Sequence, residues 1–202
     1  MAEVVSRPFD RFAGVVAILA AGVSVLYSVF FALALRGSST TAGPSALLML
    51  VSGLFGIVVF CALYECFSNL DHGFALMGLL LGVVGSAGAL VSGAHDLAIL
   101  VGPETVPGTP LNPVDPRGAL TFLVTALAVL TFARLIEVGT RLPLQLAYVG
   151  YGLGALLLLL YVGRLLVLDP AAPLPRFTAI LSGFVLNPAW NLWIGVELIR
   201  DQ

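Results

Sequence analysis

The sequence predicts an all-α fold, a polytopic membrane protein built as a six-transmembrane-helix bundle in one domain that covers residues 1–202. Hydrophobic residues make up 59% of the chain and charged residues only 10%, whereas a soluble domain carries about 25% charged residues. A chain with so few charged residues cannot form a surface that faces water. Lipid must therefore cover the surface of this protein. The apolar residues form continuous runs without alternation, which favours helices over a barrel.

Six apolar stretches are long enough to cross a bilayer, which takes about 20 residues. They lie at roughly Asp10–Leu35, Pro44–Phe67, Gly73–Val101, Arg117–Val138, Pro143–Leu168 and Pro175–Ile199. Together they occupy most of the chain, so we expect no soluble domain. The first stretch is longer than the apolar segment of a signal peptide, so we expect it to be retained as a span.

The residue types restrict the chemistry that the chain can perform. Cys61 and Cys66 are five residues apart on one predicted helix and do not face each other, which argues against a disulfide or a shared metal. Only two histidines, His72 and His95, are present, too few for a multi-histidine metal or haem site. We therefore expect no metal, no cofactor and no catalytic residues.

A first group of polar residues lies near one end of the predicted spans. Glu65 lies near the end of the second span, and Arg134 and Glu137 share a helix face near the end of the fourth. An ionisable group at membrane depth costs about 2.5–3.5 kcal/mol, so we expect Arg134 to pair with Glu137 or Glu65. The layer either holds the bundle shut or forms the floor of a ligand cavity or proton path.

A second charged group is predicted near the opposite face of the membrane. His95 and Asp96 follow the apolar run of the third span, and Arg164 lies near the end of the fifth. An Asp96–Arg164 pair would remove two isolated charges at similar depth. His95 is either a group that titrates near neutral pH or an interface residue with one hydrogen bond.

The sixth span combines a proline with amides and indoles. Pro188 is expected to kink this helix, and the carbonyl that it frees needs another partner. Asn187, Trp190 and Asn191 lie beside it. Together with Tyr148 and Tyr151 of the fifth span, they are candidate ligand-binding residues at the deepest internal cavity. The alternative is packing and interface anchoring.

Two pairs of glycines have the small-xxx-small spacing that lets helices approach closely. Gly78 and Gly82 lie in the third span, and Gly150 and Gly154 lie in the fifth. They predict either packing within the bundle or a homodimer interface.

Several short features follow one another in a set order, mainly in the C-terminal half of the chain. The order consists of a span that ends in a basic residue and of three short motifs, Ala94-His95-Asp96, Gly102-Pro103 and Leu142-Pro143. This order resembles an uncharacterised bacterial family of six-helix integral membrane proteins, a domain of unknown function. The proline-rich insertion after Pro103 departs from the family pattern. The resemblance implies no activity and no catalytic residues.

No motif in the chain names a reaction. We therefore consider three classes: a subunit of a membrane complex or a small-molecule or lipid-binding bundle; a small transporter or channel; and an intramembrane enzyme acting on a lipid or quinone. The first fits the lack of catalytic motifs best. Its partners would be the lipid bilayer and other membrane subunits or a second copy, with no nucleic acid.

An even number of spans places both termini on one side of the membrane. Five arginines fall on that side and four on the other, which favours cytoplasmic termini in the inner (plasma) membrane under the positive-inside rule. Cysteines introduced as Ala2→Cys and Gln202→Cys, in a chain lacking Cys61 and Cys66, should both be labelled from the cytoplasmic side only. Labelling of the two from opposite sides would contradict the six-span count.

Overall fold

Every element that the computed structural model describes is helical. It describes residues 8–34, 39–102, 118–166 and 173–200. The elements are α1 (Pro8–Ala34), η1 (Ser39–Thr41), α2 (Ala42–Phe67), α3 (His72–Val101), η2 (Ala119–Val124), α5 (Thr125–Val138), α6 (Leu144–Leu166), α7 (Pro173–Leu181), η3 (Ser182–Leu186) and α8 (Asn187–Arg200). η1 is a 3₁₀ turn, whereas η2 and η3 are π-helical. The predicted all-α fold is confirmed.

Within the described ranges, six helical stretches are long and apolar enough to cross a membrane. η2 continues into α5, and α7 continues through η3 into α8, so each of these combinations makes one span. The chain is therefore a multi-pass integral membrane protein with a six-helix bundle, as predicted. The predicted ends at Leu35, Arg117 and Leu168 lie outside the described residues, and the others fall within two residues of the observed ends.

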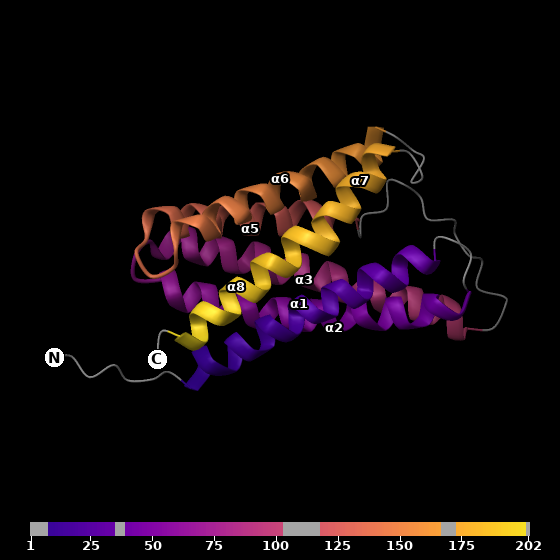
Figure 1. Cartoon of the computed structure of the whole chain (residues 1–202), viewed down its shortest axis with the longest axis horizontal. Coiled ribbons are helices and arrows are strands. Elements are labelled where there is room, and N and C mark those ends of the chain that lie inside the picture. The colour runs from indigo at the N-terminus through magenta and orange to yellow at the C-terminus, as the bar shows by residue number, and fades with distance from the viewer. Residues whose placement is uncertain (1–7, 35–38, 103–117, 167–172, 201–202) are drawn as a thin grey trace.

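The spans form a ring in sequence order. Each span packs against the next one along the chain, and α8 returns to pack against α1 (Figure 1). The start of α1 and the end of α8 lie at the same end of the bundle, together with the turn between α2 and α3. We call this the termini end, and the opposite one the far end.

A capped turn sets the antiparallel course of α2 and α3 at the termini end. Asp71 precedes α3 and accepts a hydrogen bond at 3.0 Å from the backbone N–H of Phe74, which has no partner inside the helix. The backbone N–H groups of Leu70 and Asp71 bond to the carbonyl of Phe67, at 2.9 and 3.2 Å. The turn is therefore short, and α3 begins directly beside the end of α2.

Glycines on α3 let that helix pack closely against two neighbours. A Cβ at Gly82 would collide with the ring of Phe60 on α2, and one at Gly78 would lie 2.8 Å from the ring of Phe132 on α5. The glycine pair of α6 is used in the same way, because Gly150 faces Trp190 and Gly154 faces Leu130. All four glycines of the predicted pairs therefore serve packing within the bundle.

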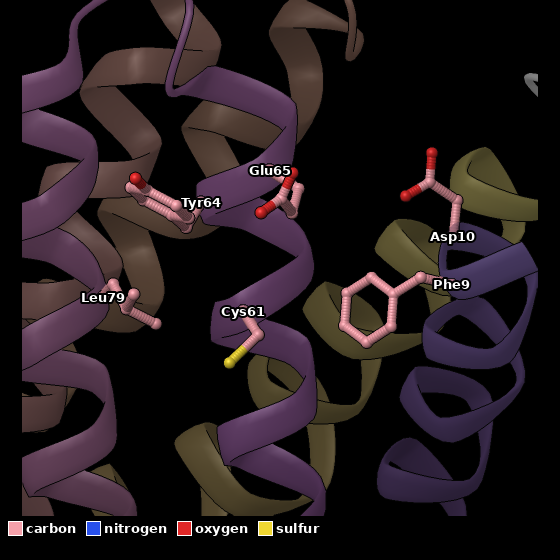
Figure 2. Close-up of a pocket in the computed structure, with 6 residues that line it drawn as sticks. All are labelled: Phe9, Asp10, Cys61, Tyr64, Glu65 and Leu79. Atoms are coloured by element: carbon pink, nitrogen blue, oxygen red, sulfur yellow. The ribbon is translucent and has the colours of Figure 1, made fainter. Parts of the chain in front are cut away.

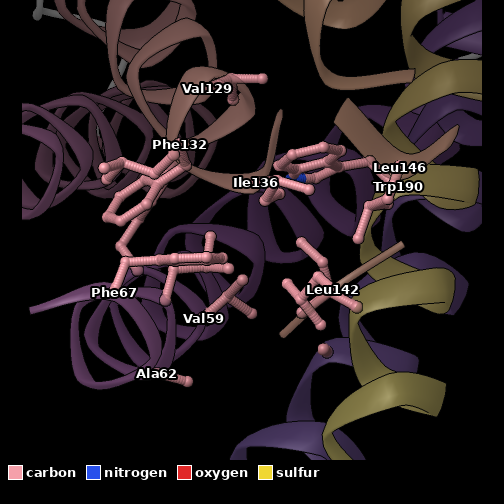
Figure 3. Close-up of a cluster of buried hydrophobic side chains, with 14 of the residues drawn as sticks. Val59, Ala62, Phe67, Val129, Phe132, Ile136, Leu142, Leu146 and Trp190 are labelled. Atoms are coloured by element: carbon pink, nitrogen blue, oxygen red, sulfur yellow. The ribbon is translucent and has the colours of Figure 1, made fainter. Parts of the chain in front are cut away.

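The apolar core fills the ring toward the termini end. Phe60 and Phe132 stack with ring centroids 5.9 Å apart, and all six spans contribute buried side chains to one cluster. Figure 3 shows Phe67, Ile136 and Trp190 among the side chains that gather between the helices. The interior here is packed apolar material.

Two glycines bring the backbones of α1 and α8 into contact and close the ring. A Cβ at Gly195 would lie 2.6 Å from the carbonyl oxygen of Gly14 and 3.0 Å from the backbone nitrogen of Ile18. A Cβ at Gly14 would lie 2.9 Å from the carbonyl oxygen of Gly195. Because these are backbone atoms, neither helix can make room by a rotamer change. Only glycine permits this crossing.

The sixth span is π-helical just before Pro188. The π-helical η3 ends at Leu186, and the backbone N–H of Asn187 bonds to the carbonyl of Ser182, five residues earlier. Proline has no N–H and crowds the carbonyl four residues before it, and a π-turn is one way to re-satisfy the freed groups in a membrane helix. The sequence predicted a kink at Pro188; the structure places a π-helical segment before this residue, and the kink itself stays a prediction.

The closure of the ring gives a first stability prediction. Gly195→Ala should lower the free energy of unfolding by about 1–3 kcal/mol, because the added methyl group overlaps rigid backbone atoms. Gly22→Ala is the matched control, since a Cβ there meets nothing within 4 Å, and alanine is the better helix former. Thermal melting in a mild detergent measures both. Equal melting temperatures for the two variants would contradict the contact.

Candidate functional site

A groove over α2 at the termini end is the candidate site. It has a volume of about 510 Å³ and is lined by Phe9, Asp10, Cys61, Tyr64, Glu65 and Leu79. Figure 2 shows that α1 supplies the first two residues, α2 the next three and α3 the last. Phe9 and Glu65 are exposed, so the groove opens on the outside of the ring rather than into its core.

The lining of the groove is amphipathic. Phe9, Cys61 and Leu79 offer carbon and sulfur surface, whereas Asp10 and Glu65 offer carboxylates. Among the described residues that line the groove, none has a basic side chain. The groove therefore has apolar walls and an acidic rim, which suits a molecule that carries both an apolar segment and a hydrogen-bond donor.

Asp10 is the unusual residue of the groove. Its side chain is only 8% exposed, and one carboxylate oxygen, Oδ2, accepts a hydrogen bond at 2.7 Å from Nη2 of Arg141. The other oxygen, Oδ1, is buried without any hydrogen-bond partner. A buried acceptor without a donor costs about 1–3 kcal/mol. Asp10 therefore keeps one strong acceptor site unused.

The fold brings Asp10 and Arg141 together from distant parts of the chain. Asp10 lies in the first turn of α1, where the helix dipole favours a negative charge. Arg141 lies in the connection between α5 and α6, which begins at Gly139 after α5 ends. The pair thus ties the start of the first span to the fourth and fifth spans at the termini end.

The predicted partner of Arg134 is present. Nη1 of Arg134 lies 2.7 Å from Oε2 of Glu137, and the same oxygen accepts a 2.6 Å hydrogen bond from the hydroxyl of Tyr151 on α6. The side chains of Arg134 and Glu137 are 59% and 36% exposed. Glu65, the other expected partner, lies in the groove on α2. The single predicted layer is therefore divided between an α5–α6 cluster and the groove.

The candidates of the sixth span form a polar seam with α1. Nδ2 of Asn187 donates at 2.9 Å to Oγ of Ser24, which in turn donates at 3.3 Å to the carbonyl of Gly183 in η3. Asn191 donates at 3.0 Å to Oδ1 of Asn187 and at 2.9 Å to its carbonyl. These contacts give the amide groups of Asn187 and Asn191 hydrogen-bond partners beside the π-helical segment.

Trp190 and Tyr148 lie outside this polar seam. Trp190 is buried in the apolar core against Gly150 and Ala133, so its indole fills space between α6 and α8. Tyr148 is exposed on the outside of α6. The five predicted ligand-binding residues therefore lie in several environments, and none of them lines the groove. The packing role considered for Trp190 is the one its contacts support.

The predicted outer site lies toward the far end. Nδ1 of His95 lies 3.7 Å from Oδ1 of Asp96, and the side chains are 42% and 44% exposed. The side chain of Arg164 lies outside the described part of the structure, so the Asp96–Arg164 pair stays a prediction.

Sequence reasoning missed the groove and the Asp10–Arg141 pair. Asp10 served only to mark the start of a span, and Arg141 only as one of the charges used for orientation. A signal was available, because six spans place the start of the first span and the connection after the fourth at one end. An acid and a base at that shared depth are natural partners.

Comparisons with known proteins add no relative. No protein-family model matches the chain, and neither a curated protein nor a solved structure matches it. Within the described ranges, no group of three or more His, Cys, Asp or Glu side chains could hold a metal ion. The resemblance to the uncharacterised bacterial family stays a prediction.

The ion pairs of Arg141 and Arg134 differ in burial, so breaking them should lower the free energy of unfolding by different amounts. Arg141→Leu leaves Asp10 buried without its charge partner, which should cost about 3–5 kcal/mol. Arg134→Leu makes the same change in an exposed pair, where water and headgroups replace the lost partner, so its effect should be small. Melting in detergent compares the two. The double variant Asp10→Leu/Arg141→Leu should be more stable than Arg141→Leu alone, and equal losses for all three would refute the buried pair.

Proposed function

We propose that the protein is a non-catalytic membrane bundle that binds an amphiphilic membrane molecule, a lipid, in the groove over α2. The observation that carries this proposal is the combination of apolar walls and an acidic rim in one pocket that opens outward. The groove has the size of a small-molecule site, for which about 300–1,000 Å³ is usual. It would hold part of the lipid while the remainder stays in the bilayer.

The position of the groove supports lipid as the ligand. Asp10 lies in the first turn of the first span, and Glu65 lies in the last turn of the second. Residues at the ends of spans lie near the depth of lipid headgroups, whereas Cys61 and Leu79 lie further into their helices. A lipid entering from the side would therefore place its polar part at the carboxylates and its apolar part along α2.

The packed interior is the reason for preferring binding to transport. A transporter or channel needs a polar path through the bundle, but the termini half of the ring is filled by aromatic and aliphatic side chains, with Phe60 and Phe132 stacked at its centre. The groove lies outside this core and offers a site that needs no such path. We further propose, on the arginine count, that the termini end faces the cytoplasm.

Filling the groove should displace the lipid. Leu79→Trp places an indole in the groove, and Leu80→Trp is the matched control because Leu80 is the next residue on α3 but is exposed outside the groove. Native mass spectrometry of protein purified in mild detergent should find bound lipid with the unchanged chain and with Leu80→Trp. Leu79→Trp should retain several-fold less. Equal retention by both variants, or no retained lipid at all, would refute the proposal.

A further inference from the structure

We infer that two copies of this chain pair through the outer face of α5 and α6, with Arg134 of each copy facing Glu137 of the other. The inference does not rest on the proposed lipid groove, which is built by α1, α2 and α3. It starts from an ion pair that faces outward. The side chains of Arg134 and Glu137 are 59% and 36% exposed, so a neighbouring molecule can reach both.

The α5–α6 cluster of Arg134, Glu137 and Tyr151 lies within the depth of the membrane. The fourth span has 20 residues, which rise about 30 Å, the thickness of the hydrocarbon core, so the whole span is needed to cross it. Arg134 lies four residues before the end of that span, and Tyr151 is the eighth residue of the fifth. Charged groups at this depth are stabilised by partners.

The cluster keeps an acceptor and donors in reserve, side by side. Oε2 of Glu137 accepts from Nη1 of Arg134 at 2.7 Å and from the hydroxyl of Tyr151 at 2.6 Å, and Oε1 takes no part in either contact. A guanidinium carries five N–H donors, and the contact with Glu137 uses Nη1. The cluster can therefore accept a second guanidinium and offer its own to a second carboxylate, which makes the surface complementary to itself.

A twofold axis along the membrane normal uses this complementarity. Such an axis keeps equivalent groups of the two copies at equal depth and presents the same patch from both. The guanidinium of Arg134 and the carboxylate of Glu137 are in contact, so they lie at nearly one depth, and each can face the opposite charge of the second copy. An anionic headgroup would match the guanidinium but would be repelled by the carboxylate. A second copy matches both.

The remainder of the face suits a pair of helices. Leu120, Leu127 and Arg134 recur every seven residues and are all exposed, so they form an outward stripe along the fourth span. A seven-residue spacing keeps such a stripe facing a partner helix. Tyr148, one turn before Tyr151 on α6, is 61% exposed and adds an aromatic side chain of the kind that is enriched at interfaces.

Cross-linking tests which face is used. In a chain lacking Cys61 and Cys66, Leu127→Cys should form a disulfide-linked dimer in membranes under mild oxidation, because Leu127 lies on the stripe. Leu19→Cys is the matched control, since Leu19 is exposed near the middle of α1, across the ring from α5, and it should stay monomeric. Equal cross-linking of the two variants, or none with Leu127→Cys, would overturn the inference.

Charge reversal tests the pairing itself. Arg134→Glu makes the ion pair wholly acidic and Glu137→Arg makes it wholly basic, so each variant alone should dimerise about tenfold more weakly, because like charges then meet across the axis. A mixture of the two variants, distinguished by mass tags, should recover mixed dimers in native mass spectrometry, and this recovery also shows that both variants fold. Unchanged dimers in the single variants, or no recovery in the mixture, would refute the pairing, as would a lipid or another protein bound at this face of a monomeric chain.

Discussion

The backbone contact between Gly14 and Gly195 is the constraint on which the arrangement of this bundle depends. Five of the six helix packings join spans that are neighbours in the sequence, but α8 must return across the ring to reach α1. A Cβ at either glycine would lie within 3.0 Å of the carbonyl oxygen of the other glycine. A side chain at either position would therefore push the two helices apart. In a membrane, where lipid is as apolar as the side chains, close packing of this kind replaces the hydrophobic effect as the force between helices.

Ring closure also determines where the polar groups lie. With α8 against α1, Ser24 meets Asn187 and the carbonyl of Gly183, so the π-helical segment before Pro188 faces hydrogen-bonding groups instead of lipid. With the start of α1 fixed at the termini end, Asp10 lies beside Arg141. Both contacts follow the rule that polar groups in hydrocarbon are satisfied inside the protein. The helix crossing is thus a condition for the polar seam as well as for the core.

The fold was largely predictable from the sequence, whereas the site was not. Continuous apolar runs require helices in lipid, and the glycine spacings pointed to close packing, so the spans and the roles of Gly78 and Gly150 followed from local information. The partner of Arg134 was also within reach, because Glu137 lies one turn away on the same helix. The groove depends on which helices become neighbours in three dimensions. Asp10 and Arg141 are 131 residues apart, and no periodicity links them. The surroundings of Trp190 were out of reach for the same reason, because only the structure shows that Gly150 lies opposite its indole.

Asp10 departs from the pattern that the rest of the described chain follows. Its Oδ1 and the hydroxyl of Thr121 are the buried side-chain oxygens without a partner in the described ranges. A threonine hydroxyl in a helix can rotate toward a nearby carbonyl at little cost, but a carboxylate is acceptor-only and must receive a proton donor from elsewhere. Arg141 satisfies one oxygen and holds the carboxylate in place, while the other oxygen stays buried without a donor. A purely structural ion pair would gain by using both oxygens in a bidentate contact with the guanidinium. The single-oxygen geometry therefore leaves a buried acceptor that the contact with Arg141 alone does not satisfy.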